Sequence, residues 1–185
     1  MFKEFEILRL FFEEPSKNRS VREAAKAARV APATASIRLK ECTAAGLLTY
    51  RAERTLDLYQ ANLESESYRD LKQYYTLRKI RDSGLLEALD EYYIKPTVVL
   101  FGSSAHGTDI ETSDIDLVVI SERVGEFPAQ AVFEKKLKKS LHLFSVRSPE
   151  ELRNEHLINS VVNGIVLRGE LRWTSPNANA KTSSR

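Results

Sequence analysis

The chain has 185 residues, which is enough for one ordinary domain or two small ones. Its 42% hydrophobic and 29% charged residues are typical of a soluble globular protein, and no apolar run approaches the roughly 18 residues that a membrane span needs. The net charge of +2 indicates no particular class of partner, while the single cysteine, Cys42, excludes an internal disulfide and favours a reducing, cytoplasmic location.

The first part of the chain predicts three short helices. Residues 2–12 carry apolar side chains at helical spacing. Ser20 and Glu23 have the spacing of a capping box, which predicts the start of a second helix. Pro32 is typical of the first position of a third helix, and Gly46 is typical of its end.

A two-stranded ribbon is predicted after these helices. Residues 47–62 have short apolar stretches around a polar turn. Three short helices followed by a ribbon is the order of a winged helix-turn-helix, so we expect this module over residues 1–62. The stretch 30–48, VAPATASIRLKECTAAGLL, resembles the turn and recognition helix of winged-helix transcription regulators.

Charge favours duplex DNA as a partner of this module. Between positions 17 and 40 there are seven basic residues and one acidic residue. A basic face on a helix-turn-helix is typical of phosphate binding. The residues expected to contact DNA from the third helix are Thr34, Ser36, Arg38 and Lys40.

The alternative interpretation of the same segment is purely structural. In it the apolar residues pack a three-helix core and the charges are solvated; these apolar residues are Ala24, Ala25, Ala28, Val30, Ile37 and Leu39. Winged helices also mediate contacts between proteins.

A helical linker is predicted over residues 63–95, with a break at Gly84. Ser67 and Asp70 resemble a capping pair at its start. The tyrosine and leucine stripe from Tyr68 to Ile80 is broad. It indicates either a helix packed between two domains or the interface of a homodimer, which would match a two-fold DNA site.

Residues 96–172 predict a small α/β domain with a mixed sheet, so the whole chain is assigned to the α+β class. Strands are expected at 97–101, 114–120 and 141–146, with a last extended piece at 164–170. A helix at 129–139 is expected to place Val132, Phe133 and Leu137 in the core, and a second helix is expected at 148–162, capped by Ser148. Residues 173–185 are polar and predict a disordered tail.

Two short motifs in this domain predict a site. Gly102 and Ser103 follow a buried strand, and Asp114 and Asp116 open the next strand after a gap of ten residues. Carboxylates at i and i+2 on a strand point to the same side, where their charges repel. A bound cation explains this arrangement, whereas a turn cap at Asp114 and a surface role for Asp116 leave the matching Gly-Ser unexplained.

Gly-Ser, ten residues and then Asp-x-Asp resembles the signature of minimal nucleotidyltransferases of the DNA polymerase beta-like type. The likeness covers residues 98–168, and the order of winged helix, linker and nucleotidyltransferase resembles a group of prokaryotic proteins. The resemblance implies that Gly102, Ser103 and Gly107 bind the nucleotide. It further implies that the catalytic Asp114 and Asp116 bind Mg²⁺, which aligns an in-line attack on the alpha phosphorus.

This chain departs from that pattern at two positions. The expected third carboxylate is missing, because the strand at 141–146 reads LHLFSV and His142 stands near the expected place. A neutral imidazole can act as a base but is a poor magnesium ligand, so the alternative is a plain strand histidine. His106 occupies a position where relatives often carry a basic residue.

Two functions fit these features. The first is transfer of a nucleoside monophosphate, with AMP expected, from a nucleoside triphosphate to a protein or small-molecule acceptor. The resemblance extends to antitoxins that modify HEPN-domain toxins, which makes such a toxin a candidate partner. The second is a DNA-binding regulator or antitoxin whose nucleotidyltransferase fold binds nucleotide with little or no turnover.

Overall fold

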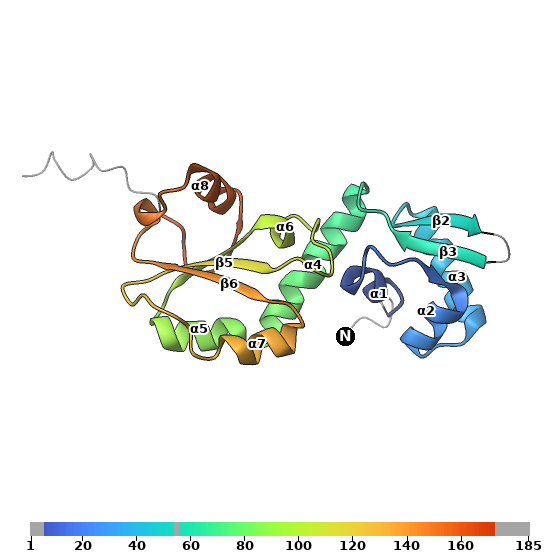
Figure 1. Cartoon of the computed structure of the whole chain (residues 1–185), viewed down its shortest axis with the longest axis horizontal. Coiled ribbons are helices and arrows are strands. Elements are labelled where there is room, and N and C mark those ends of the chain that lie inside the picture. The colour runs from blue at the N-terminus through green and yellow to red at the C-terminus, as the bar shows by residue number, and fades with distance from the viewer. Residues whose placement is uncertain (1–5, 54–55, 173–185) are drawn as a thin grey trace, which may run out of the picture.

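A computed structural model describes residues 6–53 and 56–172 of the chain. Figure 1 shows an elongated molecule in which a group of helices and strands lies at one end and a larger sheet lies at the other. A long helix, α4, runs between them. Within the described ranges, no helix is long and apolar enough to cross a membrane. The predicted tail at 173–185 lies outside the described residues.

The N-terminal group consists of helices α1 to α3 and a small antiparallel sheet. Its elements are α1 (Leu8–Glu13), β1 (Arg19–Ser20), α2 (Val21–Ala28), α3 (Pro32–Ala44), β2 (Leu48–Glu53) and β3 (Leu56–Ala61). The strand order is β1-β3-β2, and both pairs are antiparallel. Helices α2 and α3 and the β2–β3 hairpin form where the sequence predicts them. Within the described residues the first predicted helix begins only at Leu8, and its residues 2–5 lie outside them. Strand β1 was not predicted.

Local signals in the sequence fix the start of α2 and the limits of α3. The Ser20 side chain accepts a hydrogen bond from the backbone N–H of Glu23, and the Glu23 carboxylate accepts one from the Ser20 backbone N–H. Hydrogen bonds donated to this carboxylate by the Ser20 backbone N–H and hydroxyl lower the pKa of Glu23. Pro32 is the first residue of α3, and Gly46 follows the helix in the left-handed region with φ of 73°. The predicted capping box is confirmed.

The N-terminal core is built around aromatic side chains. Phe11 of α1, Tyr59 of β3 and Tyr68 of α4 are all buried in it. Leu39 contributes from α3, as the structural interpretation of this segment expected. The same interpretation was wrong about Ile37, which is 59% exposed because it lies on the outer face of α3.

The predicted linker consists of two helices, α4 (Glu66–Asp82) and α5 (Leu85–Tyr93), and Gly84 lies between them with φ of 81°. The cap of α4 is Ser65, whose side chain accepts a hydrogen bond from the Tyr68 backbone N–H. The predicted capping pair of Ser67 and Asp70 was wrong, because the helix has already begun at position 66.

Helix α4 belongs to both cores. Tyr68 is buried in the N-terminal core and Ile80 in the core of the larger sheet, both with 0% exposure. Leu71 and Tyr75 pack against the N-terminal core, and Tyr74 is 46% exposed. Most of the stripe that suggested a dimer interface is therefore covered by the chain itself. The homodimer stays a prediction, with the exposed Tyr74 at its interface, and sedimentation equilibrium tests it by measuring the mass of the particle in solution.

The C-terminal elements form a mixed sheet with helices on both faces. They are β4 (Thr97–Phe101), α6 (Gly102–Ala105), β5 (Ile115–Ile120), α7 (Gln130–Leu137), β6 (Leu141–Val146), a 3-10 turn (Pro149–Glu151), α8 (Glu155–Val162) and β7 (Ile165–Arg168). The strand order is β6-β5-β4-β7. β5 and β6 are parallel, whereas β4 is antiparallel to both of its neighbours. The predicted mixed sheet is confirmed.

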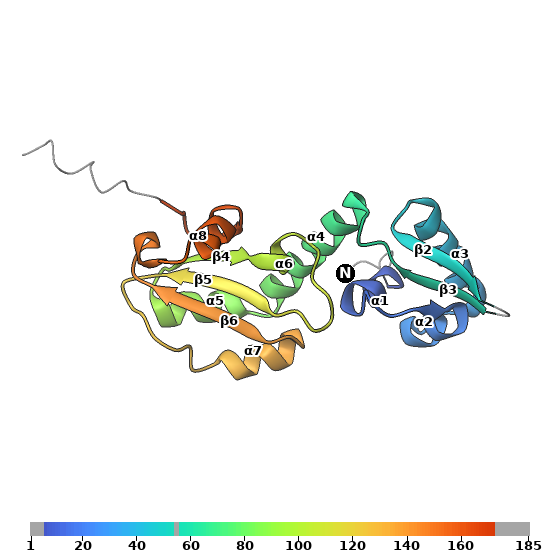
Figure 2. The same cartoon turned by 45° about the horizontal axis from the view of Figure 1, so that its top comes forward.

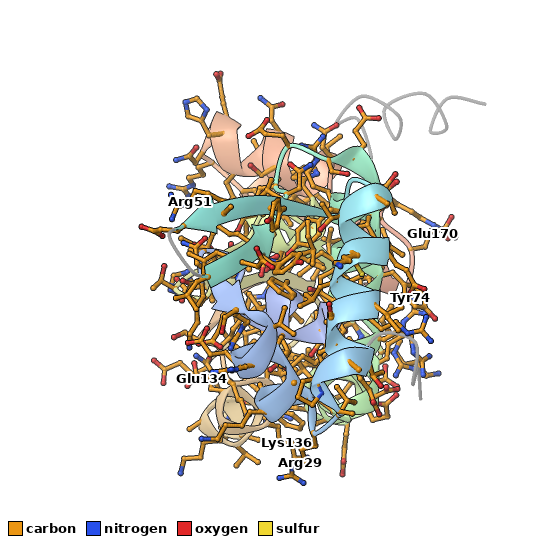
Figure 3. All side chains as sticks on the ribbon, turned by 90° about the vertical axis from the view of Figure 1, so that its right-hand side faces the viewer. Arg29, Arg51, Tyr74, Glu134, Lys136 and Glu170 are labelled. Carbon is orange, nitrogen blue, oxygen red and sulfur yellow. The ribbon has the colours of Figure 1, made fainter. Side chains whose placement is uncertain are left out.

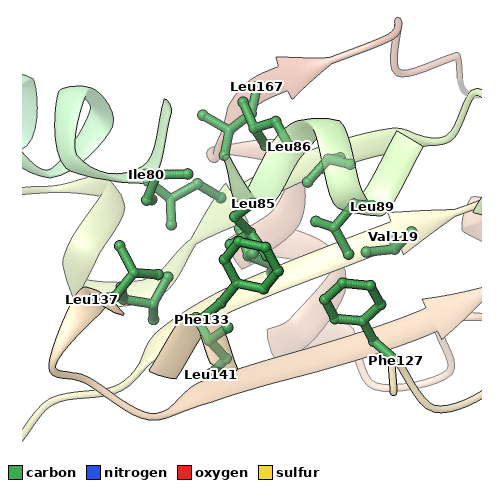
Figure 4. Packing of buried hydrophobic residues seen from close by; sticks show 14 of the residues in the cluster. Ile80, Leu85, Leu86, Leu89, Val119, Phe127, Phe133, Leu137, Leu141 and Leu167 are labelled. Atoms are coloured by element: carbon green, nitrogen blue, oxygen red, sulfur yellow. The ribbon is translucent and has the colours of Figure 1, made fainter. Parts of the chain in front are cut away.

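Alternation along the strands separates two apolar layers. Leu117 and Val119 of β5 face α5 and α7, while Val118 between them faces the side of α8. Figure 2 shows these helices on opposite faces of the sheet. In Figure 4, Phe133 and Leu137 of α7 pack beside the leucines of α5.

Two details of the predicted helices were wrong. Val132 is 53% exposed because it lies on the outer face of α7. The single helix expected at 148–162 is divided into a 3-10 turn and α8. Asn154 caps α8, since its side chain accepts hydrogen bonds from the backbone N–H groups of His156 and Leu157.

Candidate active site

The Gly-Ser turn follows strand β4 directly. The strand is buried and ends at Phe101, and Gly102 then takes φ of 70°, a conformation that glycine adopts without steric cost. A Cβ atom at Gly102 would lie 2.6 Å from Oδ2 of Asp116. Glycine at this position therefore permits the turn and also the close approach of the Asp116 carboxylate.

The two serines of the turn have different surroundings. The Ser103 hydroxyl makes no hydrogen bond within the described part of the chain, and the residue is partly exposed. The Ser103 carbonyl accepts hydrogen bonds from the N–H groups of His106 and Thr108, both at 3.1 Å. Ser104 is buried, and its hydroxyl donates to the Asp114 carbonyl at 3.2 Å. Ser103 is thus available to a ligand, whereas Ser104 ties the turn to the start of β5.

Asp114, Asp116 and His142 form one cluster. Asp116 is paired with Phe101 on one side and with His142 on the other in the sheet register. The distance from His142 Nδ1 to Asp116 Oδ1 is 3.3 Å, and that from His142 Nε2 to Asp114 Oδ2 is 3.5 Å. The side chains are 24% exposed for Asp116, 37% for Asp114 and 56% for His142. The cluster is therefore open to a ligand from solvent.

The side chains present fit a Mg²⁺ ion that takes part of its ligands from the protein and the rest from water or a bound substrate. Asp114 and Asp116 supply carboxylate oxygens, and β6 carries no acid. Across residues 6–53 and 56–172, no group of three or more His, Cys, Asp or Glu side chains is arranged to hold a metal ion. Magnesium usually takes one or two carboxylates and completes its six ligands with water and substrate phosphates. Two carboxylates beside the Gly-Ser turn meet the protein's share of this requirement.

Gly107 packs against helix α4. It is buried with φ of 65°, and a Cβ atom there would overlap the carbonyl of Arg69. This contact explains why residue 107 is glycine. A direct role of Gly107 in nucleotide binding stays a prediction.

A buried charge cluster, which sequence reasoning missed, holds the loop between the two motifs. Asp109 is 1% exposed, and its carboxylate lies 3.3 Å from Lys72 Nζ and 2.7 Å from Lys139 Nζ. The three residues come from the loop, from α4 and from the segment before β6. Because 37 and 30 positions separate the two lysines from Asp109, no local pattern in the sequence could signal their contact.

An open hollow of about 490 Å³ adjoins Asp114. Ser113 and Asp114 form one wall, and Glu134, Lys135 and Lys138 from the end of α7 form another. Its size lies within the range of roughly 300–1,000 Å³ typical of small-molecule sites. The Asp114 carboxylate is therefore open to a small molecule from this side.

The predicted DNA-contacting residues lie on α3. Thr34, Arg38 and Lys40 are exposed, whereas Ser36 is half-buried. Arg38 pairs with Glu41 at 3.0 Å on the helix surface. Figure 3 views the molecule from this end, with α3 toward the viewer.

The predicted basic face has a different composition from the one that the sequence indicated. Arg19 is 6% exposed and pairs with Glu14, so it is a structural residue and offers no charge to a ligand. Lys17 also pairs with Glu14, at 3.2 Å. Arg22 and Lys26 of α2 remain exposed.

Comparison with known families supports the C-terminal assignment. Residues 83–166 match a family model described as nucleotidyltransferase domain. The matched range contains the Gly-Ser turn, both aspartates and His142, and it leaves out the N-terminal elements. The match therefore supports a nucleotidyltransferase domain in the C-terminal part of the chain and a function of the nucleotidyltransferase type. A comparison with curated proteins found no match.

Proposed function

We propose that the chain is a metal-dependent enzyme that transfers a nucleoside monophosphate, with AMP as the first candidate, to a protein or small-molecule acceptor. The observation that carries the proposal is the short distance between the Gly-Ser turn and the Asp-x-Asp carboxylates. The turn carries Ser103, whose hydroxyl makes no hydrogen bond within the described residues, and it lies so close to Asp116 that any side chain larger than hydrogen at residue 102 would touch the carboxylate. The hollow beside Asp114 gives the acceptor a way in.

The roles of the residues follow from their positions. The Ser103 hydroxyl and the backbone of the turn bind the terminal phosphates of a nucleoside triphosphate. Asp114 and Asp116 hold Mg²⁺, which supplies charge neutralisation at the phosphates and alignment of the reacting groups. His142 lies within 3.5 Å of both carboxylates, where it can orient them.

Turnover is expected to be slow without a partner. The third carboxylate of related nucleotidyltransferases would serve as general base or second metal ligand, and in this chain the strand residue beside Asp116 is His142 instead of an acid. An imidazole is a poor magnesium ligand. A protein acceptor that brings its own charged groups to the site, such as a HEPN-domain toxin, would supply what β6 lacks.

The proposal is tested by incubating the full chain with labelled nucleoside triphosphates, Mg²⁺ and candidate acceptors. We expect label on an acceptor with the wild type and none with Asp116→Asn, which keeps the size of the side chain and removes its charge. Asp70→Asn is the matched control, because it removes the same charge at an exposed position of α4 outside the cluster of Asp114, Asp116 and His142. Equal labelling by wild type and Asp116→Asn would reject the proposal.

The alternative is a DNA-binding regulator or antitoxin that binds nucleotide without turning it over. Two observations favour it. Strand β6 has no acid beside the aspartates. Helix α3 presents an outer face with Thr34, Ile37 and Arg38, where a methyl-rich and cationic surface suits the thymine methyl and the phosphates of a duplex. In this alternative the N-terminal elements act as a winged helix-turn-helix.

A further inference from the structure

One face of α4 contacts the loop that joins the two motifs of the candidate site. Arg69, Lys72 and Gln73 are spaced i, i+3 and i+4, so they lie on the same side of the helix. The Arg69 carbonyl lies against Gly107, and the Gln73 amide donates to the Ala105 carbonyl. Lys72 donates to the Asp109 carbonyl and also faces its carboxylate. The helix therefore contacts alternate residues of the loop, 105, 107 and 109.

The same loop is held from its other side by Lys139. The Lys139 ammonium donates to the carboxylate of Asp109 and to the carbonyl of Ile110, both at 2.7 Å, and to the carbonyl of Ser113 at 3.1 Å. Ser113 immediately precedes Asp114. Contacts thus run without a gap from Lys72 through Asp109 and Lys139 to the residue beside the candidate metal ligand.

The cluster of Lys72, Asp109 and Lys139 buries its charges, and a gain in folding stability does not explain why. Lys72 and Asp109 are each 1% exposed, and burial lowers the pKa of Lys72 while Asp109 opposes that shift. Replacing a buried ion pair by apolar residues is often neutral or stabilising, because desolvation of the charges offsets their attraction. What the cluster does supply is a fixed loop position, because hydrogen bonds from the two lysines hold Asp109, Ile110 and Ser113 in defined places.

Helix α4 is a rigid base for this geometry. Its first half is packed in the N-terminal core, where the Tyr68 hydroxyl donates to the Phe11 carbonyl at 2.7 Å. Its second half reaches the core of the sheet through Ile80. A helix fixed at both ends cannot follow small movements of the loop.

We propose that Lys72 is a positioning residue, which from α4 sets the distance between the phosphate-binding turn at Ser103 and the metal-binding carboxylate of Asp114. The inference rests on the proposed nucleotide and metal site. It assigns part of that site's geometry to a helix that contributes no ligand. Magnesium-dependent nucleotide binding then depends on a residue that touches neither the nucleotide nor the metal.

The test compares two lysines of α4 in the full chain. Lys72→Met removes the loop contact and leaves Asp109 paired with Lys139, so no buried carboxylate loses its last partner. Lys79→Met is the matched control. Lys79 is partly buried, and burial lowers its pKa, but its side chain makes no ion pair or hydrogen bond within the described residues. Calorimetry with ATP, in Mg²⁺ and in chelator, gives the factor by which magnesium raises the affinity of each variant.

We expect Lys72→Met to reduce that factor roughly fivefold or more, within the usual range of coupling between sites, and Lys79→Met to leave it unchanged. A purely structural role would change the affinity with magnesium and with chelator alike, and so would not move the factor. Should Lys72→Met fail to fold, Gln73→Met decides, because it breaks a neighbouring contact of the same helix face and adds no buried charge. Here too a smaller factor supports the inference.

The outcomes separate this inference from the proposal beneath it. A wild type in which magnesium does not raise ATP affinity would overturn the proposed site and, with it, the role of Lys72. A wild type with the magnesium effect, together with a folded Lys72→Met that keeps it in full, would overturn the positioning role alone.

Discussion

The absence of a Cβ atom at Gly102 allows the Asp116 carboxylate to approach the Gly-Ser turn. The spacing of Gly-Ser and Asp-x-Asp predicts a turn and a strand, and both form. The spacing alone does not say how near the motifs approach each other. The structure supplies that information, because a Cβ atom added at residue 102 would lie only 2.6 Å from the Asp116 carboxylate.

We expect Gly102→Ala to remove the effect of magnesium on nucleotide binding. Gly102 has a left-handed backbone conformation, so alanine there lowers the free energy of unfolding by about 1–2 kcal/mol. The methyl group of alanine would also displace the Asp116 carboxylate. Gly46→Ala is the matched control, because Gly46 has nearly the same φ of 73° and no atom within 4 Å of its Cβ position.

Urea denaturation should therefore show a similar loss of stability in both glycine variants. Nucleotide titration should show a loss of magnesium coupling in Gly102→Ala only. Normal coupling in a folded Gly102→Ala would mean that the close approach of Asp116 has no role in the site.

Residue-level prediction succeeds where a local signal or a family resemblance exists and fails where neither does. The resemblance placed His142 near the aspartates, because it expects a third carboxylate on the strand at 141–146, and the structure pairs His142 with Asp116. Lys72 and Asp109 could not be paired, because a buried lysine in a helix has the same sequence signature as an exposed one. Arg19 was assigned to a basic surface for the same reason, and the fold buries it against Glu14.

At the scale of elements, capping side chains decide where helices begin. The Ser20 and Glu23 box was predictable because both members lie within one turn. The cap of α4 was predicted two residues late, at Ser67 instead of Ser65, since both serines are acceptable caps by sequence. The helix at 148–162 was predicted as continuous because its apolar spacing continues past Asn154, where a new helix begins.

The two serines before α4 give a direct test of this cap. We expect Ser65→Ala to lower the free energy of unfolding by about 1 kcal/mol, because the Tyr68 backbone N–H loses its acceptor. Ser67→Ala should change it by less than about 0.5 kcal/mol, because Ser67 is exposed inside the first turn and alanine favours helix. Thermal or urea unfolding monitored by circular dichroism measures both. The reverse order of effects would place the cap at Ser67.

At the scale of the whole molecule, α4 connects the two groups of elements by entering both cores. Its tyrosines and leucines were read from the sequence as a linker or a dimer stripe. The structure covers most of them within one chain, because a helix shared by two cores needs apolar side chains on more than one side. The number and order of elements were predictable from their patterns, whereas the packing of α4 depends on contacts between distant parts of the chain.

If the N-terminal elements bind DNA, the salt dependence of binding will show it. Replacing Arg38 and Lys40 together by alanine should weaken duplex binding and lower the slope of log affinity against log salt by about two, one for each lost phosphate contact. Arg153→Ala with Arg172→Ala is a control of equal charge on exposed residues of the C-terminal part. Fluorescence anisotropy over a range of salt gives the slopes. Equal slopes in the two double variants would reject α3 as the DNA-binding surface.

The central claim is that Asp114 and Asp116 hold a cation together with a nucleotide. Calorimetric titration of the full chain with ATP, in Mg²⁺ and in chelator, tests it most directly. We predict that magnesium raises ATP affinity about tenfold or more in the wild type, equivalent to about 1.4 kcal/mol, and not at all in Asp116→Asn. Ser103→Ala should weaken binding in both conditions, because it removes a phosphate contact that needs no metal. The same ATP affinity with magnesium, with chelator and in Asp116→Asn would show that these aspartates form no metal site.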